Sequence, residues 1–149
     1  MRLGALIIVT SLIAAACGGD RNRIDIEDPY VLPPLPGRDV AVGYFSANNR
    51  GEVARTLTGA RSASAERVEI HTHVHDGDMM RMRRVDEVAL EPARPVAFAP
   101  GGLHLMLFGV QLPDAGAVEV VLELDDGNEE RVSFAVRPRN LRKSGESTQ

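Results

Sequence analysis

The sequence predicts an all-β domain, a sandwich or small barrel built from about eight short strands. No stretch carries a helical period over roughly ten residues. Instead, short runs of alternating or β-branched residues recur along the chain, and Gly, Pro, Asn and Asp separate them at regular spacing. The chain has 149 residues, which is enough for one domain with a hydrophobic core.

The first part of the predicted domain contains three strands. Residues 24–26 alternate apolar and polar side chains, which predicts a first strand at the edge of the sheet. The prolines of residues 29–36 predict an extended, irregular segment along that edge. Residues 40–47 are rich in β-branched and aromatic side chains, as a core strand requires. Residues 48–52 predict a turn and residues 54–60 a weak strand.

A hairpin is predicted in the middle of the chain. Residues 66–75 alternate cleanly, with apolar side chains on one face and acidic and imidazole side chains on the other. Asp76-Gly77 is a type I′ turn signal, and residues 79–85 continue as the return strand. A two-residue loop at this turn sets the cross-strand partners. The predicted pairs are His75 with Asp78, His73 with Met80, and His71 with Met82.

The later strands are short and apolar. They are predicted over residues 88–90, 96–98, 103–110, 118–124 and 131–136. Pro92 and Pro95 separate the first two of these runs. From Arg137 onward no apolar pattern remains, which predicts a disordered tail. We place the folded domain over residues 24–138 and the tail over residues 139–149.

The N-terminus has the features of a targeting segment. Arg2 precedes an apolar run over residues 3–16, which is too short for a comfortable transmembrane helix. Small residues stand directly before Cys17, the only cysteine, in an arrangement that resembles a bacterial lipoprotein cleavage site. We therefore expect a signal peptide over residues 1–16, a lipid on Cys17 and a tether over residues 17–23. A plain secretory signal with an incidental cysteine is the alternative.

The composition and the expected cellular location exclude some classes of protein. A lipidated Cys17 implies a membrane-anchored protein of the periplasm or cell envelope, and we expect a monomer. Aromatic residues make up 4% of the chain, Trp is absent and the net charge is −4. These values argue against a nucleic-acid binder, which needs basic charge and aromatic stacking.

Histidine and methionine are concentrated in one window. All four histidines and the four methionines other than Met1 lie between His71 and Met106. Methionine used as a gap filler in the core would be scattered along the chain. Thioether and imidazole together are ligands that copper(I) accepts, whereas zinc and hard cations disfavour thioether. The window therefore predicts a soft-metal site.

Four of these residues can meet at one metal ion. His71 and Met82 are predicted to oppose each other across the hairpin, and His104 and Met106 share a face of a later strand. We expect this set to bind one copper(I) ion. A blue-copper site needs a cysteine thiolate, and Cys17 is assigned to the lipid. A zinc site on three histidines would leave the methionines unexplained.

The other members of the window have weaker assignments. His73, His75 and Met80 are auxiliary candidates, as outer partners, as ligands for copper(II) or as a loading path. Of these, His73 is favoured for a direct role. Met79 is on the opposite face of its strand from Met80 and is expected to pack in the core.

The spacing of the four ligands resembles that of the PCuAC family of periplasmic copper chaperones. Ten residues separate His71 from Met82, twenty-one separate Met82 from His104, and Met106 closes a His-x-Met pair. The resemblance implies a cupredoxin-like Greek-key barrel that binds one copper(I) ion. It also implies transfer of copper to an accepting protein, such as another assembly chaperone or the subunit that holds the binuclear copper centre of cytochrome c oxidase. His75 departs from the pattern, since Met is common there.

Three alternatives to delivery remain at the level of sequence. A copper-sequestering tolerance lipoprotein without a dedicated recipient would use identical ligands. A structural lipoprotein would carry the His/Met window incidentally. An enzyme is disfavoured, because no carboxylate is placed as a general base beside the histidines and no G-x-S-x-G nucleophile motif occurs.

Overall fold

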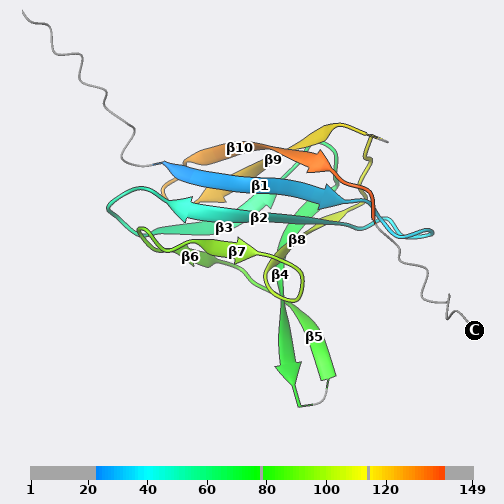
Figure 1. Ribbon diagram of the computed structural model, residues 1–149, viewed down its shortest axis with the longest axis horizontal. Helices are drawn as coiled ribbons and strands as arrows, with labels where there is room; N and C mark the ends of the chain where they lie inside the picture. Colours follow the sequence, from blue (N-terminus) through cyan, green and yellow to red (C-terminus); the bar gives the residue numbers. More distant parts are fainter. Residues whose placement is uncertain (1–22, 78, 114, 140–149) are drawn as a thin grey trace, which may run out of the picture.

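Alternation of side chains along the chain produces an all-β structure. The computed structural model describes residues 23–77, 79–113 and 115–139, and this part of the chain forms ten strands (Figure 1). They are β1 (Ile24–Leu32), β2 (Ala41–Asn49), β3 (Arg55–Arg61), β4 (Arg67–Asp76), β5 (Met79–Arg84), β6 (Val88–Leu90), β7 (Val96–Phe98), β8 (His104–Phe108), β9 (Ala117–Leu124) and β10 (Glu129–Val136). The predicted all-β class is confirmed, with ten strands in place of about eight. None of the described residues forms a helix long and apolar enough to cross a bilayer.

The strands form one continuous sheet that curls on itself. Its order is β5-β4-β8-β2-β1-β10-β9-β3-β6, and β7 pairs separately with β2. All of these pairs are antiparallel except β1 with β10, which run parallel. Because β3 also contacts β4, the sheet comes round on itself as a barrel.

The core is filled from the inward faces of the barrel strands. Phe45 stacks on Phe98 with ring centroids 4.2 Å apart and meets the ring of Phe134 edge-on at 5.7 Å. Fully buried aliphatic residues surround these rings, namely Val31, Leu57, Leu90, Leu105, Leu107 and Val120. Gly43 allows this packing, because a Cβ there would lie only 3.3 Å from the Cβ of Leu105. This hydrophobic cluster includes no histidine or methionine, whereas His104 is buried outside it.

β1 is not the edge strand that the sequence predicts. It lies between β2 and β10 and continues through Pro29 to Leu32. The pairing with β2 shifts between Glu27 and Tyr30, and Asp28 adopts a φ of 50° at this bulge. A proline has no N–H to donate, so a bulge is one of the few places where an interior strand accepts it.

Asn49 ends β2 as a buried side chain, where the sequence predicts a turn. Its Nδ2 donates hydrogen bonds of 2.8 Å to the carbonyl oxygens of Val53 and Leu90, and its Oδ1 accepts one from the amide of Gly51. The turn therefore begins only after Asn49. Asn has a strong turn propensity, but here its amide satisfies the backbone of two neighbouring segments.

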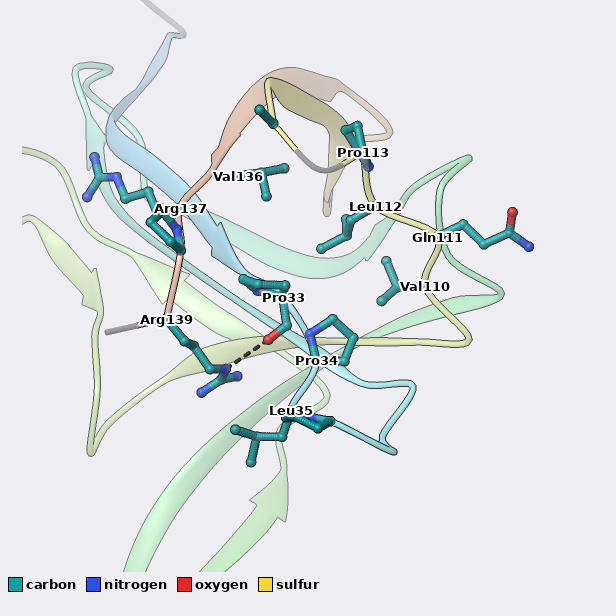
Figure 2. Close-up of a pocket in the computed structure, with 13 residues that line it drawn as sticks. Pro33, Pro34, Leu35, Val110, Gln111, Leu112, Pro113, Val136, Arg137 and Arg139 are labelled. Atoms are coloured by element: carbon teal, nitrogen blue, oxygen red, sulfur yellow. Dashed lines mark hydrogen bonds between the residues drawn. The ribbon is translucent and has the colours of Figure 1, made fainter. Parts of the chain in front are cut away.

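Residues directly after β10 remain attached to the barrel. The amide of Arg137 donates to the carbonyl of Val31 at 2.9 Å, and the Arg137 guanidinium lies over the ring of Tyr30 at 4.2 Å. Figure 2 shows Arg139, whose Nε donates to the carbonyl of Pro33 at 2.8 Å. The prediction of disorder from Arg137 onward is therefore wrong for residues 137–139, and residues 140–149 lie outside the described residues.

The β4–β5 hairpin projects from the barrel (Figure 1). β4 pairs with β8 only from Arg67 to His71, and it pairs with β5 from His71 to Asp76. Beyond His71 the hairpin is thus a two-stranded ribbon that pairs with no other strand of the described residues. His71 is the junction, since it pairs with His104 on one side and Arg84 on the other.

Candidate metal centre

The register of the hairpin differs from the predicted one by two residues. Met82 lies opposite His73, not His71, and Asp76 pairs with Met79. The chain therefore reverses one residue later than predicted, and Gly77 takes the left-handed conformation with a φ of 64°. A shift of two residues preserves the face of each side chain, because the strand period is two. The soft donors stay on one face, but their partners change.

Three imidazoles converge where the ribbon joins the barrel. His71 and His104 are cross-strand partners with ring centroids 6.1 Å apart. His73 is nearer still, with its ring centroid 5.0 Å from that of His104. The structure therefore brings His73, an auxiliary candidate, into the group that His71 and His104 form.

The two thioethers of the predicted set meet at a surface hollow beside these rings. Met106 is half-buried and lies opposite Glu69 on β4, whereas Met82 is 54% exposed on β5. Both line a hollow of about 410 Å³, together with Leu35, Val42 and further residues of the β1–β2 connection. All four predicted ligands thus lie at or beside one region of the surface, with Met82 the most accessible.

His104 is held in one tautomer. Its side chain is buried, and its Nδ1 donates a hydrogen bond of 2.9 Å to the carbonyl of Gly102. A carbonyl only accepts, so Nδ1 carries the proton and Nε2 keeps its lone pair. Burial lowers the pKa of His104, and the neighbouring rings of His73 and His71 lower it further, while the bond to Gly102 acts in the opposite direction. The ring is therefore neutral at physiological pH, which is the form that binds a metal.

Glu69 fixes the ring of His71. The Nε2 of His71 donates to Oε2 of Glu69 at 2.8 Å. This hydrogen bond is the main reason that the pKa of Glu69 is lowered, and the guanidinium groups of Arg67 and Arg84 act in the same direction. With its proton on Nε2, His71 presents the lone pair of Nδ1. That nitrogen is buried and has no hydrogen-bond partner among the described residues, and the same holds for Nδ1 of His73.

A buried imidazole nitrogen without a partner is costly unless something binds it. Among the described residues, however, no three His, Cys, Asp or Glu side chains lie close enough together to hold a metal ion. A tripod of histidines, as a zinc site would need, is thus not preformed here. The thioethers of Met82 and Met106 line the neighbouring hollow and are the nearby soft donors that the sequence predicts for this site.

The outer residues of the window lie on the projecting ribbon. His75 and Met80 are directly opposed and exposed. Met79 is 57% exposed, so the prediction that it packs in the core is wrong. The reason is that every residue of β5 is exposed on a ribbon with no second layer to cover it. Cys17 and the predicted signal segment lie outside the described residues.

Sequence reasoning missed the residues that orient the imidazoles. Glu69 precedes His71 by two positions and so shares its face, which is a signal that could have found it. Gly102 could not be found, because its carbonyl meets His104 only through the turn before β8. Tyr44 was missed as well, and its ring lies 6.5 Å from that of His104.

A second hollow, of about 860 Å³, adjoins the one beside Met82 and Met106 (Figure 2). The two share Leu35 and Arg139. The remaining lining is mostly proline and aliphatic side chains, with Gln111 and Arg137 as its other polar residues. It contains no imidazole or thioether, so the candidate metal centre is confined to the smaller hollow and the adjoining histidines.

The sequence matches a known protein family. A family model described as "Putative lipoprotein LpqE-like" matches residues 24–136. A curated relative, "Putative lipoprotein Lxx21020" of Leifsonia xyli subsp. xyli (strain CTCB07), is 28% identical over 123 residues, which are 80% of this chain and 73% of that protein.

Solved structures of similar fold include PCuAC domains and a copper(I)-bound protein, by their descriptions. The "Copper-bound PCuAC domain from PmoF2" is 29% identical, with a TM-score of 0.66 over 78% of this chain and 93% of that one. The "Solution structure of CuI-DR1885 from Deinococcus Radiodurans" is 24% identical, with a TM-score of 0.61 over 86% and 85% of the two chains, and shows the fold alone. The chain therefore has a PCuAC-like fold, and the predicted cupredoxin-like barrel is confirmed. The four metal ligands stay a prediction.

Proposed function

Since this chain belongs to the LpqE-like family and has the fold of a PCuAC domain, we propose that it is an extracytoplasmic copper(I) chaperone. The observation that carries the proposal is that two buried imidazole nitrogens, Nδ1 of His71 and Nδ1 of His73, have no hydrogen-bond partner in the part of the chain that the structure describes. His73 lies directly opposite the exposed thioether of Met82. Neutral nitrogen next to exposed thioether is a donor set for a soft monovalent cation. Copper is the cargo in this proposal, and the protein is a carrier, not an enzyme.

We propose His71, Met82, His104 and Met106 as the ligands of one copper(I) ion, with His73 as an additional donor. Glu69 holds the proton of His71 on Nε2, and the Gly102 carbonyl holds that of His104 on Nδ1. Each ring is thereby locked with its other nitrogen as the donor. All the proposed ligands are neutral, so the bound ion keeps its single positive charge.

Exposure favours delivery over storage. Met82 is 54% exposed at the base of a projecting ribbon, whereas His104 is 2% exposed in the barrel wall. A donor group of an accepting protein can therefore reach the ion from the side of Met82. Copper would then be shared briefly between the two proteins, and the thioether of Met82 would leave first. A closed, buried site would release its ion slowly and would suit sequestration better.

As recipient we propose the binuclear copper centre of cytochrome c oxidase, reached directly or through another assembly chaperone. The ligand spacing that resembles PCuAC chaperones supports this choice. Two arginines line the hollow beside the proposed site, although the whole chain carries a net charge of −4. They are Arg38 and Arg139, and Asp39 is the acidic residue of the same lining. We therefore expect the accepting protein to present acidic side chains around its copper site.

We also propose that Cys17 carries a lipid that holds the domain at a membrane of the cell envelope. The family description and the name of the curated relative, both of lipoproteins, support this proposal. The lipid would confine the domain to the membrane plane and raise the effective concentration of a membrane-bound recipient. Labelling with a radioactive fatty acid tests it: the Cys17→Ala variant should lose the label and leave the membrane fraction.

Anaerobic titration with copper(I) against a strong competing chelator tests the binding itself. We expect one tight equivalent, and X-ray absorption should show about two sulfur and two or three nitrogen ligands. Coordination by oxygen, or by nitrogen alone, would contradict the assignment. Gene deletion separates delivery from storage: delivery predicts a loss of oxidase activity that added copper restores, whereas storage predicts copper sensitivity alone.

A further inference from the structure

We propose that the tip of the β4–β5 hairpin is a second, outer copper(I) site formed by His75 and Met80. It would receive copper first and pass it to the inner site, and in this role it rests on the proposed function. The binding itself is a separate claim, because the two residues involved are not among the ligands proposed for the inner site.

The register places these two donors together. His75 and Met80 are directly opposed in the antiparallel pair. Directly opposed side chains have their Cβ atoms about 4.5–5.5 Å apart, so an imidazole and a thioether can both reach one ion between them. Two neutral donors are sufficient for weak, exchangeable binding of copper(I). Both residues are exposed, and Met80 keeps 54% of its surface accessible.

The same geometry repeats one step closer to the barrel. His73 opposes Met82 exactly two positions along each strand from the outer pair, and both pairs lie on one face of the ribbon. Two residues along a strand correspond to roughly 6.6 Å. The hairpin thus carries two His–Met pairs in series, and the inner pair is next to His104.

The composition of β5 needs an explanation that packing does not give. All six of its residues are exposed, and they are three methionines and three arginines. An exposed methionine side chain is not stabilised by burial, and exposed positions are mostly occupied by polar residues. A soft ion explains Met80 and Met82, which share the face of the histidines. It does not require Met79, which lies on the other face opposite Asp76.

Transfer from the outer to the inner pair is a ligand exchange. The sulfur of Met82 or the imidazole of His73 forms one bond to copper as one bond to Met80 or His75 breaks. All four donors are neutral, so the ion stays copper(I), and neither an electron nor a proton has to move. Each step replaces one bond from copper to a neutral donor by another. The inner site retains the ion because it adds His71, His104 and Met106.

A titration of the full chain beyond one equivalent tests the outer site. The first equivalent of copper(I) is added against a strong chelator and the second against a weak one, without oxygen. The wild-type chain should bind two equivalents. The His75→Ala/Met80→Ala double variant should bind only the first, with unchanged affinity. Met79→Ala is the matched control, with the same side chain and similar exposure on the opposite face, and it should bind both.

Methyl-labelled methionine gives a second readout from the same samples by NMR. The second equivalent should shift the methyl signal of Met80 and leave that of Met79 unchanged. The proposal is overturned if the wild-type chain binds a single equivalent, or if Met79→Ala loses the second as the double variant does. A missing first equivalent with an intact second would instead contradict the proposed function and leave the outer site standing.

Discussion

His73 lies directly opposite Met82, and its ring centroid is 5.0 Å from that of His104. It is therefore placed between the exposed thioether and the buried imidazole of the proposed site. Its Nδ1 is buried and has no hydrogen-bond partner. The hairpin register thus gives His73 the position across from Met82 that the sequence assigns to His71.

Replacing either thioether of the inner site should weaken copper(I) binding strongly. We expect Met82→Ala and Met106→Ala each to lower the affinity roughly 100-fold or more, since loss of a ligand costs more than loss of an outer partner. Competition titration measures the change. The matched control is Met79→Ala, which should bind as the wild-type chain does. Equal effects of all three substitutions would show that the sulfur atoms act only through general surface properties.

His73 should contribute to the affinity of the inner site to about the same degree as His71. We expect His73→Ala and His71→Ala to lower copper(I) affinity by similar factors, because Nδ1 of each ring is equally buried and unpartnered. X-ray absorption should show one nitrogen ligand fewer in each variant. His75→Ala, on the same face but at the ribbon tip, should leave the first equivalent unchanged. An unaltered affinity of His73→Ala would restrict the site to the four residues of the spacing motif.

Glu69 should position His71 without contacting the metal. Its carboxylate accepts a hydrogen bond from the Nε2–H of His71, so Glu69→Gln weakens the preference for the tautomer with a free Nδ1. We expect copper(I) affinity to fall roughly 10–100-fold, the usual effect of losing an outer partner of a metal ligand. Nitrogen-15 NMR of the metal-free chain should show a larger share of the other His71 tautomer. Glu119→Gln, on the exposed face of β9, is the control and should change neither quantity.

The contact between Asp28 and Arg137 should make stability depend on acid. Arg137 donates to both carboxylate oxygens of Asp28, and these hydrogen bonds lower the pKa of Asp28 from its ordinary value of 3.8. The folded state therefore prefers the ionised carboxylate. Its stabilising contribution is complete above pH 3.8 and is lost as the pH falls through the lower folded-state pKa.

The Asp28→Asn variant isolates this contribution. Asparagine tolerates the positive φ of 50° at this bulge, so the backbone can stay as it is. We expect the difference in unfolding free energy between wild type and variant to shrink below the ordinary pKa of the carboxyl group. Urea unfolding at a series of acidic pH values measures it. If this difference in unfolding free energy is constant down to the lowest pH, the charge of Asp28 does not contribute to stability.

The fold should not depend on copper. The hydrophobic core cluster that includes Phe134 contains none of the proposed ligands. We expect Phe134→Ala to lower the unfolding free energy by about 3–5 kcal/mol in the metal-free chain. Met82→Ala, exposed on the ribbon, should leave that free energy unchanged. Loss of the β-sheet signal in circular dichroism when copper is removed would contradict this expectation.

The sequence predicted most of the strands and both faces of the hairpin. Alternation is a local property with a period of two, so the histidines share one face of β4 and Met80 and Met82 share one face of β5. The predicted register differs from the observed one by two residues, an even number, so the two sets still fall on the same face of the hairpin. Residues 88–90 and 96–98 are strands with the predicted bounds. The edge position of β1 was wrong because a proline suggests an edge, and only the fold shows that a bulge at Asp28 lets the strand pair on both sides.

By itself, then, the sequence determined the strand periods, the face on which the donors lie and the soft character of those donors. Only the tertiary structure decided which donor side chains lie opposite each other. Register depends on where the chain reverses and on the pairing of β4 with β8, and this set Met82 against His73. The free nitrogen of each ring depends on Glu69 and Gly102, which are brought to the rings by backbone geometry that no spacing in the sequence encodes.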